Sequence, residues 1–191
     1  MGNTVGREIS LLNKDAYILG LWLADGYWWS SSIGISNTDS RIIKRFRKFL
    51  EKRFPKERIK TRLYKATIMK KARRDLYHVY VNSRSLLREF RKAGRLRYLI
   101  NVEDLYKYFA GRFDGDGSID KDMKTDCRIV YGSLKDADQD KKLLEKLGYK
   151  PKIYFYKKAK TYVIYLKPLD AKDFVQKIKL YSIKLISPRR D

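Results

Sequence analysis

The chain has 191 residues, of which 43% are apolar and 14% aromatic, and its formal net charge is +23 at pH 7. This composition supports a packed core, and the single cysteine and single histidine exclude an internal disulfide, a cysteine-based zinc site and a histidine-rich metal site. The excess of positive charge favours a polyanionic partner, with nucleic acid ahead of an acidic membrane surface.

Residues 15–98 form the first predicted half, after a short N-terminal arm at residues 1–14. Hydrophobic periodicity predicts, in chain order, a helix over 15–24, a strand and its return over 27–36, a helix over 38–54, strands over 59–69 and 76–82, and a helix over 85–93. Asp15 suits the start of the first helix and Gly26 its end. Pro55 is expected to stop the second helix, and Gly94 to close the last.

Residues 99–191 repeat this order with tighter connections. The predicted elements are a helix over 102–115, a hairpin over 118–133, a helix over 136–147 ended by Gly148, strands over 152–157 and 162–167, and a helix over 171–181. The stretch 49–54 before a strand resembles 144–149 before another strand, which supports an internal duplication. We expect the two halves to form one compact unit.

The first helix of each half carries the same short pattern: residues 18–26 are ILGLWLADG and residues 109–117 are FAGRFDGDG. Residues four apart share one helix face, so each helix has a stripe of small residues, and two such stripes can approach closely. The expected helix interface consists of Gly20, Ala24, Gly111 and Gly115. This packing would bring Asp25 and Asp116 together, where their carboxylates suit a hard cation such as Mg²⁺.

These two stretches, whose aspartates lie 91 residues apart, resemble the paired signature of the LAGLIDADG homing endonucleases in their single-chain form. The first acidic position of the signature is Leu23 in one copy and Asp114 in the other, whereas the last acidic position is acidic in both. The resemblance implies an α+β fold of two pseudo-symmetric αββαββα halves, each with an antiparallel, saddle-forming sheet, joined through the signature helices.

The resemblance also implies a catalytic centre at Asp25 and Asp116, the acidic residues that bind the catalytic metals. We expect Mg²⁺ there, with Mn²⁺ or Ca²⁺ able to substitute in binding, held also by backbone carbonyls that we place at Ala24 and Gly115. Taken alone, each aspartate favours the interpretation of a helix-terminal turn residue before glycine, and the occurrence of the pair shifts the balance towards a metal site. Each also opposes the dipole of its helix, an electrostatic cost that a bound cation would relieve.

Solvent-organising partners in this family are a Gln or Asn after the first hairpin and a lysine near the centre. Asn37 fits the first role by position, and Lys121 and Lys167 are candidates for the second. For each lysine, a phosphate contact or a surface charge is the favoured interpretation. Asn37 could instead cap the following helix, as could Thr38 or Asp39.

The free face of each predicted sheet is the expected DNA-binding surface. Its alternating side chains are Lys60, Arg62, Tyr64 and Tyr77 in the first half, and Lys152, Tyr154, Tyr156 and Tyr165 in the second. The wider expected set adds Trp29, Ser31, Lys71, Arg73, Arg74, Arg128 and Lys158. Residues 56–98 carry 15 Lys/Arg against 3 Asp/Glu. Such faces suit readout of major-groove base edges, with phosphate contacts setting the register.

We therefore expect a monomeric, Mg²⁺-dependent endonuclease that hydrolyses one phosphodiester per strand of a long, asymmetric intron-insertion site in double-stranded DNA. An RNA maturase, with intron RNA as partner, is the alternative on the same scaffold, and a transcription regulator without cleavage is a third. The two retained acidic residues favour the nuclease.

Membrane and targeting patterns are not recognised in the sequence. The apolar run 17–24 is too short to span a bilayer, and residues 1–14 lack a signal-peptide pattern. We expect an intracellular, cytoplasmic protein without membrane contact. The chain has 2 Gln and 5 Asn against 45 Lys/Arg and 22 Asp/Glu, which is typical of thermophile proteins.

Overall fold

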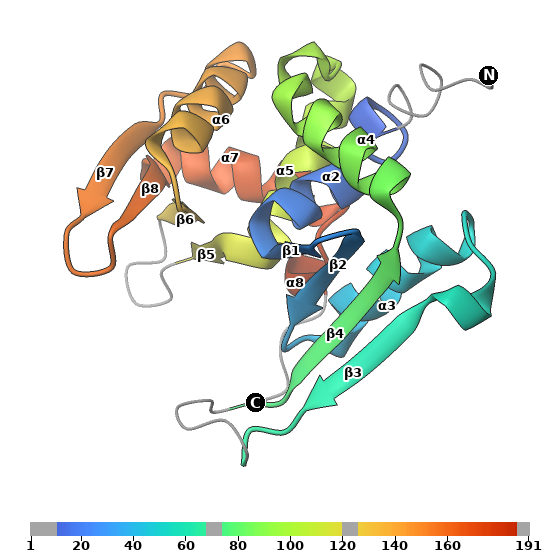
Figure 1. Cartoon of the computed structure of the whole chain (residues 1–191). Coiled ribbons are helices and arrows are strands. Elements are labelled where there is room, and N and C mark those ends of the chain that lie inside the picture. Colours follow the sequence, from blue (N-terminus) through green and yellow to red (C-terminus); the bar gives the residue numbers. More distant parts are fainter. Residues whose placement is uncertain (1–10, 68–73, 120–125, 187–191) are drawn as a thin grey trace.

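The computed structural model of the chain describes residues 11–67, 74–119 and 126–186 (Figure 1). The first half contains α2 (Ala16–Asp25), β1 (Gly26–Trp29), β2 (Ser32–Asn37), α3 (Ser40–Glu51), a 3-10 turn (Lys56–Arg58), β3 (Lys60–Tyr64), β4 (Leu76–Asn82) and α4 (Arg84–Arg95). A second 3-10 turn (Arg97–Leu99) leads to α5 (Val102–Asp116), β5 (Gly117–Ile119), β6 (Cys127–Tyr131), α6 (Leu134–Lys146), β7 (Lys152–Tyr156), β8 (Thr161–Leu166), α7 (Pro168–Lys179) and α8 (Ile183–Ile186).

Each half has a four-stranded antiparallel sheet, and the two sheets share one topology. The strand orders are β1-β2-β4-β3 and β5-β6-β8-β7. Helices α3 and α4 contact the first sheet, and α6 and α7 the second. The predicted α+β fold of two αββαββα halves is therefore confirmed, and α8 follows as an additional short helix.

Helices α2 and α5 lie side by side at the centre and join the two halves (Figure 1). A Cβ atom on Gly20 would lie 2.0 Å from the carbonyl oxygen of Tyr108, and one on Gly111 would lie 2.0 Å from that of Tyr17. A Cβ on Gly115 would lie 2.3 Å from the Cβ of Ala24. Glycine permits this approach because it has no side chain to separate the backbones.

Strand register decides which face of the first sheet is buried. Ile33 pairs with Val81 and Ile35 with Val79, and all four side chains are fully buried toward the helices. Since side chains alternate between faces, the neighbouring positions lie on the open face. Tyr77 has the parity of Val79 and packs against the hydrophobic core. Its predicted place on the free face was therefore wrong.

Several predicted boundaries move. The second helix begins at Ser40, because the Asp39 side chain accepts a hydrogen bond from the backbone N–H of Arg41 and caps it, and it ends at Glu51. Gly94 does not close α4: it lies inside the helix, where a Cβ would lie 3.1 Å from a methyl carbon of Leu23. The third strand of the first half is shorter than predicted and ends at Tyr64. The final helix begins earlier, at Pro168, a residue suited to the first helical position.

The helix ends around the centre follow simple rules. Gly26 ends α2 by leading directly into β1, as Gly117 leads α5 into β5. Gly148, after α6, has φ +89°, a conformation that favours glycine. Asp15 is the N-cap residue of α2, and its carboxylate pairs with Arg53 at 3.1 Å.

Over the described residues, no helix combines the length and apolar character that crossing a bilayer requires.

Candidate active site

The C-terminal ends of α2 and α5 bring Asp25 and Asp116 into one electrostatic centre. A Cβ on Gly115 would lie 3.3 Å from the carboxyl carbon of Asp25, so this carboxyl group lies against the last turn of α5. The negative charge of Asp116 also contributes to raising the pKa of Asp25. The negative ends of two helix dipoles and two carboxylates therefore converge at this point.

Both aspartates are harder to ionise than an ordinary carboxyl group. Burial raises the pKa of Asp25 to about 6, while the hydrogen bond from Asn37 opposes the shift. Burial also raises the pKa of Asp116, against the positive charges of Arg112 and Lys184. Desolvation disfavours the charged form of each group, so an added cation would stabilise both carboxylates.

Asn37 is fixed between the start of α3 and the centre. Its Nδ2 donates to a carboxylate oxygen of Asp25 at 2.5 Å, and its Oδ1 accepts from the backbone N–H of Asp39 at 2.7 Å. Asp39, and not Asn37 or Thr38, is the N-cap residue of α3. The structure therefore places Asn37 where it can orient the Asp25 carboxylate.

Lys184 is the lysine whose charge acts on both aspartates, and the sequence did not indicate it. Its Nζ donates to the carbonyl oxygens of Gly115 at 3.0 Å and Phe113 at 3.4 Å. Its charge lowers the pKa of Asp25 and of Asp116. Of the two lysines proposed from sequence, Lys167 is exposed at the N-cap of α7, and Lys121 lies outside the described residues.

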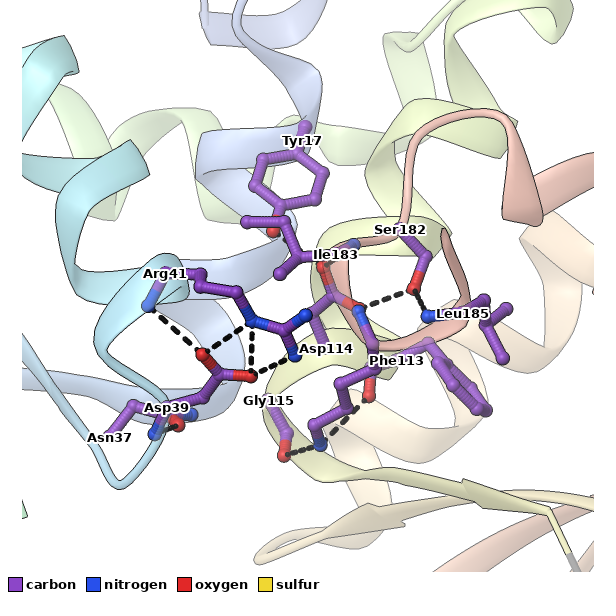
Figure 2. A network of polar contacts seen from close by, with 11 residues as sticks. Tyr17, Asn37, Asp39, Arg41, Phe113, Asp114, Gly115, Ser182, Ile183 and Leu185 are labelled. Atoms are coloured by element: carbon purple, nitrogen blue, oxygen red, sulfur yellow. Dashed lines mark hydrogen bonds and ion pairs between the residues drawn. The ribbon is translucent and has the colours of Figure 1, made fainter. Parts of the chain in front are cut away.

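Asp114, the first acidic position of the second signature, anchors the segment that carries Lys184 (Figure 2). Its fully buried carboxylate accepts hydrogen bonds from Tyr17 Oη at 2.6 Å, Ser182 Oγ at 2.5 Å, Ile183 N at 2.7 Å and Lys184 N at 3.2 Å. Asp114 thus joins α2, α5 and the start of α8. In the first copy this position is Leu23, which packs on Gly94 instead.

A second buried network lies on the other side of α5. Asp140 is fully buried and pairs with Arg97 Nε at 2.8 Å and Arg112 Nε at 3.3 Å. The hydroxyl groups of Tyr108 and Tyr131 donate to the same carboxylate, at 2.9 and 3.0 Å. This network holds the Arg112 guanidinium close enough to the centre to lower the pKa of both Asp25 and Asp116.

The donor set at the helix ends fits a hard divalent cation. It offers two carboxylates with raised pKa values, and Lys184 shows that the Gly115 carbonyl already accepts a positive group. Mg²⁺ is typically held by one or two carboxylates plus water and substrate phosphates. Among the described residues, no group of three or more His, Cys, Asp or Glu side chains is arranged to hold a metal ion.

The open faces of the two sheets carry most of the side chains proposed to contact DNA. In the first half, Lys60, Arg62 and Tyr64 pair across β3 and β4 with Tyr80, His78 and Leu76. In the second half, Arg128 and Lys152 flank Tyr165, and Tyr154 lies beside them with its ring centroid 6.0 Å from that of Tyr165. Tyr156 follows on the same face of β7 by parity.

The remaining proposed contacts lie at the margins of these faces. Trp29 is 74% exposed at the end of β1, and Ser31 follows in the turn. Arg74 and Lys158 are exposed beside β4 and after β7, whereas Lys71 and Arg73 lie outside the described residues. Sequence reasoning missed His78 and Tyr80 on the open face. The buried parity of Val79 and Val81 was the signal that could have found them.

Comparison with known proteins gives a match to a family model within the first half and a likeness of fold for the whole chain. Residues 13–93 match the model of the LAGLIDADG-like domain. No curated protein matches the sequence. A structure of mesophilic variants of the homing endonuclease I-DmoI is similar at 20% identity with a TM-score of 0.64, covering 94% of this chain and 98% of that chain.

Two further structures agree. I-DmoI in complex with DNA and Mn is 21% identical, with a TM-score of 0.63 and coverage of 96% of this chain and 99% of that chain. The N-terminal LAGLIDADG domain of DUF199/WhiA is 16% identical, with a TM-score of 0.65 and coverage of 90% and 81%. The likeness of fold extends over nearly the whole chain.

Proposed function

Because the first half of this chain is a LAGLIDADG-like domain and the whole chain has the two-halved LAGLIDADG fold, we propose that it is a metal-dependent, site-specific DNA endonuclease. The observation that carries the proposal is the convergence of Asp25 and Asp116 at the ends of α2 and α5. The similar I-DmoI structures include complexes with DNA and Mn and with target DNA and Mg, which supports DNA as the substrate and Mg²⁺ as the cofactor.

The substrate we propose is a long, asymmetric duplex of the intron-insertion kind, bound by a monomer inside the cell. Each half offers one open sheet face with Arg, Lys and Tyr side chains. The two faces differ in sequence, so each would read a different half of the target. The formal charge of +23 would draw the duplex to these faces and make binding strongly salt-dependent.

In the proposed mechanism, Asp25 and Asp116, with the carbonyl oxygens of Ala24 and Gly115, would hold Mg²⁺. When bound, this ion activates water and stabilises the leaving oxygen of an in-line displacement. Asn37 orients the Asp25 carboxylate through its 2.5 Å hydrogen bond. Lys184 and Arg112 favour the ionised form of both carboxylates. One aspartate serves each strand, and the sheet faces hold the duplex against the helix ends.

The test is cleavage of a selected target. Duplexes enriched by binding in Ca²⁺ from a random library are cloned into a supercoiled plasmid and incubated with Mg²⁺. We expect the wild type to nick and linearise the plasmid, and Asp25→Asn and Asp116→Asn each to lose this activity while they still bind DNA in Ca²⁺. Asp138→Asn is the matched control, because Asp138 lies on the surface of α6 in an ion pair with Lys142.

Cleavage that persists in both active-site variants would overturn the proposal. Wild-type binding without cleavage in Mg²⁺ or Mn²⁺ would point to a regulator. Tighter binding of intron RNA than of duplex would point to a maturase.

A further inference from the structure

The two flanks of the paired helices differ, and one of them is hollow. A cavity of about 780 Å³ lies where the end of α2, helix α4 and the start of α6 meet, and Asp116 forms part of its lining. On the other flank, Arg45 donates a hydrogen bond to the carbonyl oxygen of Tyr181 at 2.7 Å, and its guanidinium carbon lies 3.5 Å from the centroid of the Tyr17 ring. The Tyr17 hydroxyl in turn donates to Asp114.

The charged residues in the lining of this cavity are mainly cationic. Arg91, Arg95 and Lys135 are exposed at its rim, and Arg97 and Arg112 are buried in its wall. The acidic residues of the lining are Asp116 and Asp136. Asp136 pairs with Arg97 at 2.9 Å. Among the described residues, Asp116 is then the one acidic residue of the lining that remains to balance the positive charges at the rim. The cavity therefore attracts an anion.

Two residues of the lining, Trp22 and Arg112, contribute buried donors that form no hydrogen bond with the described residues. Arg112 is only 3% exposed, and its Nε forms no hydrogen bond with any described residue. Its ion pair with Asp140, at 3.3 Å, shares a carboxylate that Arg97 and two tyrosines already use. The indole N–H of Trp22 is likewise buried without a hydrogen-bond acceptor among the described residues. Buried polar groups of this kind normally have a partner.

We propose that this cavity binds a backbone phosphate of the nucleic-acid strand that passes Asp116. Guanidinium groups match phosphate oxygens in geometry and charge, and the cavity opens beside the carboxylate assigned to one strand. Trp22 and Trp28, with ring centroids 5.6 Å apart, add an aromatic wall for the sugar or base next to that phosphate. The inference rests on the proposed nuclease function and adds a contact on one side of the duplex.

The test compares two double variants of α4 with the same change in charge. Arg91→Gln/Arg95→Gln alters the rim of the cavity, whereas Arg84→Gln/Arg88→Gln alters exposed positions of α4 outside its lining. Binding of the selected duplex is measured in Ca²⁺ at several salt concentrations. We expect the slope of log K against log salt to become shallower by about 1 to 2 for the rim variant, and the control to keep the wild-type slope.

A second arm separates a backbone phosphate from a free phosphate anion. Pyrophosphate is titrated into proteins carrying Trp29→Phe, so that fluorescence reports on Trp22 and Trp28. The proposal is supported if pyrophosphate competes with the duplex for binding to the wild-type rim and if this competition is lost in the rim variant.

Three results would overturn it: equal slopes in the rim variant and the wild type, an equal loss of slope in both double variants, or pyrophosphate binding that does not affect duplex binding. A failure of the nuclease function is seen separately, because it abolishes Mg²⁺-dependent nicking in the wild type, whereas the slopes are measured without cleavage.

Discussion

Gly111→Ala tests whether the close approach of α2 and α5 organises the molecule. A Cβ on Gly111 would lie 2.0 Å from the carbonyl oxygen of Tyr17 and 2.7 Å from the backbone nitrogen of Leu21. Both obstructing atoms belong to the backbone of α2 and cannot rotate away. Restoring a separation of 3.0 Å requires the two helices to move apart by about 1 Å.

Helix propensity and steric overpacking change the stability of Gly111→Ala in opposite directions, so the direction of the change in unfolding temperature shows which one dominates. Helix propensity alone predicts that Gly→Ala in a helix interior stabilises the protein by about 1 kcal/mol. Overpacking of a tight interface costs about 1 to 3 kcal/mol and sometimes more. If the steric term dominates, the unfolding temperature falls, by about 2 to 4 °C per kcal/mol for a chain of this size.

Thermal unfolding followed by circular dichroism measures this change, with Gly132→Ala as the control. A Cβ on Gly132 would meet nothing within 4 Å, so this variant should unfold within about 2 °C of the wild type. Nicking in Mg²⁺ should fall by about 100-fold in Gly111→Ala, because a displacement of about 1 Å separates the two aspartates from their productive arrangement. A Gly111→Ala protein as stable and as active as the wild type would refute the reasoning.

Three further predictions concern charge. The folded-state pKa of Asp25, about 6, exceeds the ordinary aspartate value of 3.8, so the folded metal-free protein binds more protons than the unfolded chain between these values, and its stability falls as pH rises through that window. Asp25→Asn should therefore raise the free energy of unfolding at pH 7 by up to about 3 kcal/mol, and urea unfolding that shows no gain would contradict this. Lys184→Met should raise the pKa of both aspartates and move the acidic limb of the nicking profile to higher pH, whereas Lys179→Met, on the surface of α7, should leave it in place. Asp140→Asn removes the charge shared by two buried arginines and should cost about 3 to 5 kcal/mol in thermal unfolding; a loss below about 1 kcal/mol would show that the arginines find another partner.

The sequence was sufficient for the order of elements and for the central helix pair. Hydrophobic periodicity is a local property, and the spacing of Gly20 and Gly111 from the aspartates dictates which helix faces can meet. Both features depend on residues within a single helix or strand, such as the 10 residues of α2 or the 15 of α5. They could therefore be predicted without knowing which elements pack against each other.

Features that depend on a neighbouring helix or strand could not be predicted from the sequence. The pattern of its own strand predicts the open face for Tyr77, whereas the pairing of Tyr77 with Asn37 sets the register and turns its side chain toward the helices. Glycine often follows the last turn of a helix, so Gly94 alone predicts a helix end, whereas here its missing side chain makes room for Leu23 from another helix.

Lys184 lay furthest from prediction. It reaches the centre only because Asp114, 70 residues earlier, accepts hydrogen bonds from the backbone N–H groups of Ile183 and Lys184. Nothing in the residues around Lys184 records this contact. The available signal was Asp114, the buried carboxylate at the first acidic position of the second signature. It indicates that some segment must donate hydrogen bonds to this carboxylate, but it does not indicate that the segment carries Lys184.

The two halves share their strand pairing and the glycines between their central helices, but they differ in the residues around each aspartate. Ile35 lies opposite Gly26 and Ile129 opposite Gly117, so Asn37 and Tyr131 occupy equivalent positions two residues later. Asn37 donates to Asp25, whereas the hydroxyl of Tyr131 donates to Asp140. The glycines that control helix separation are the same in both copies, because any side chain there would force the backbones apart. The residues around the carboxylates carry no such constraint, so each half could acquire its own electrostatic environment, and the two aspartates are chemically inequivalent although their backbones are related by symmetry.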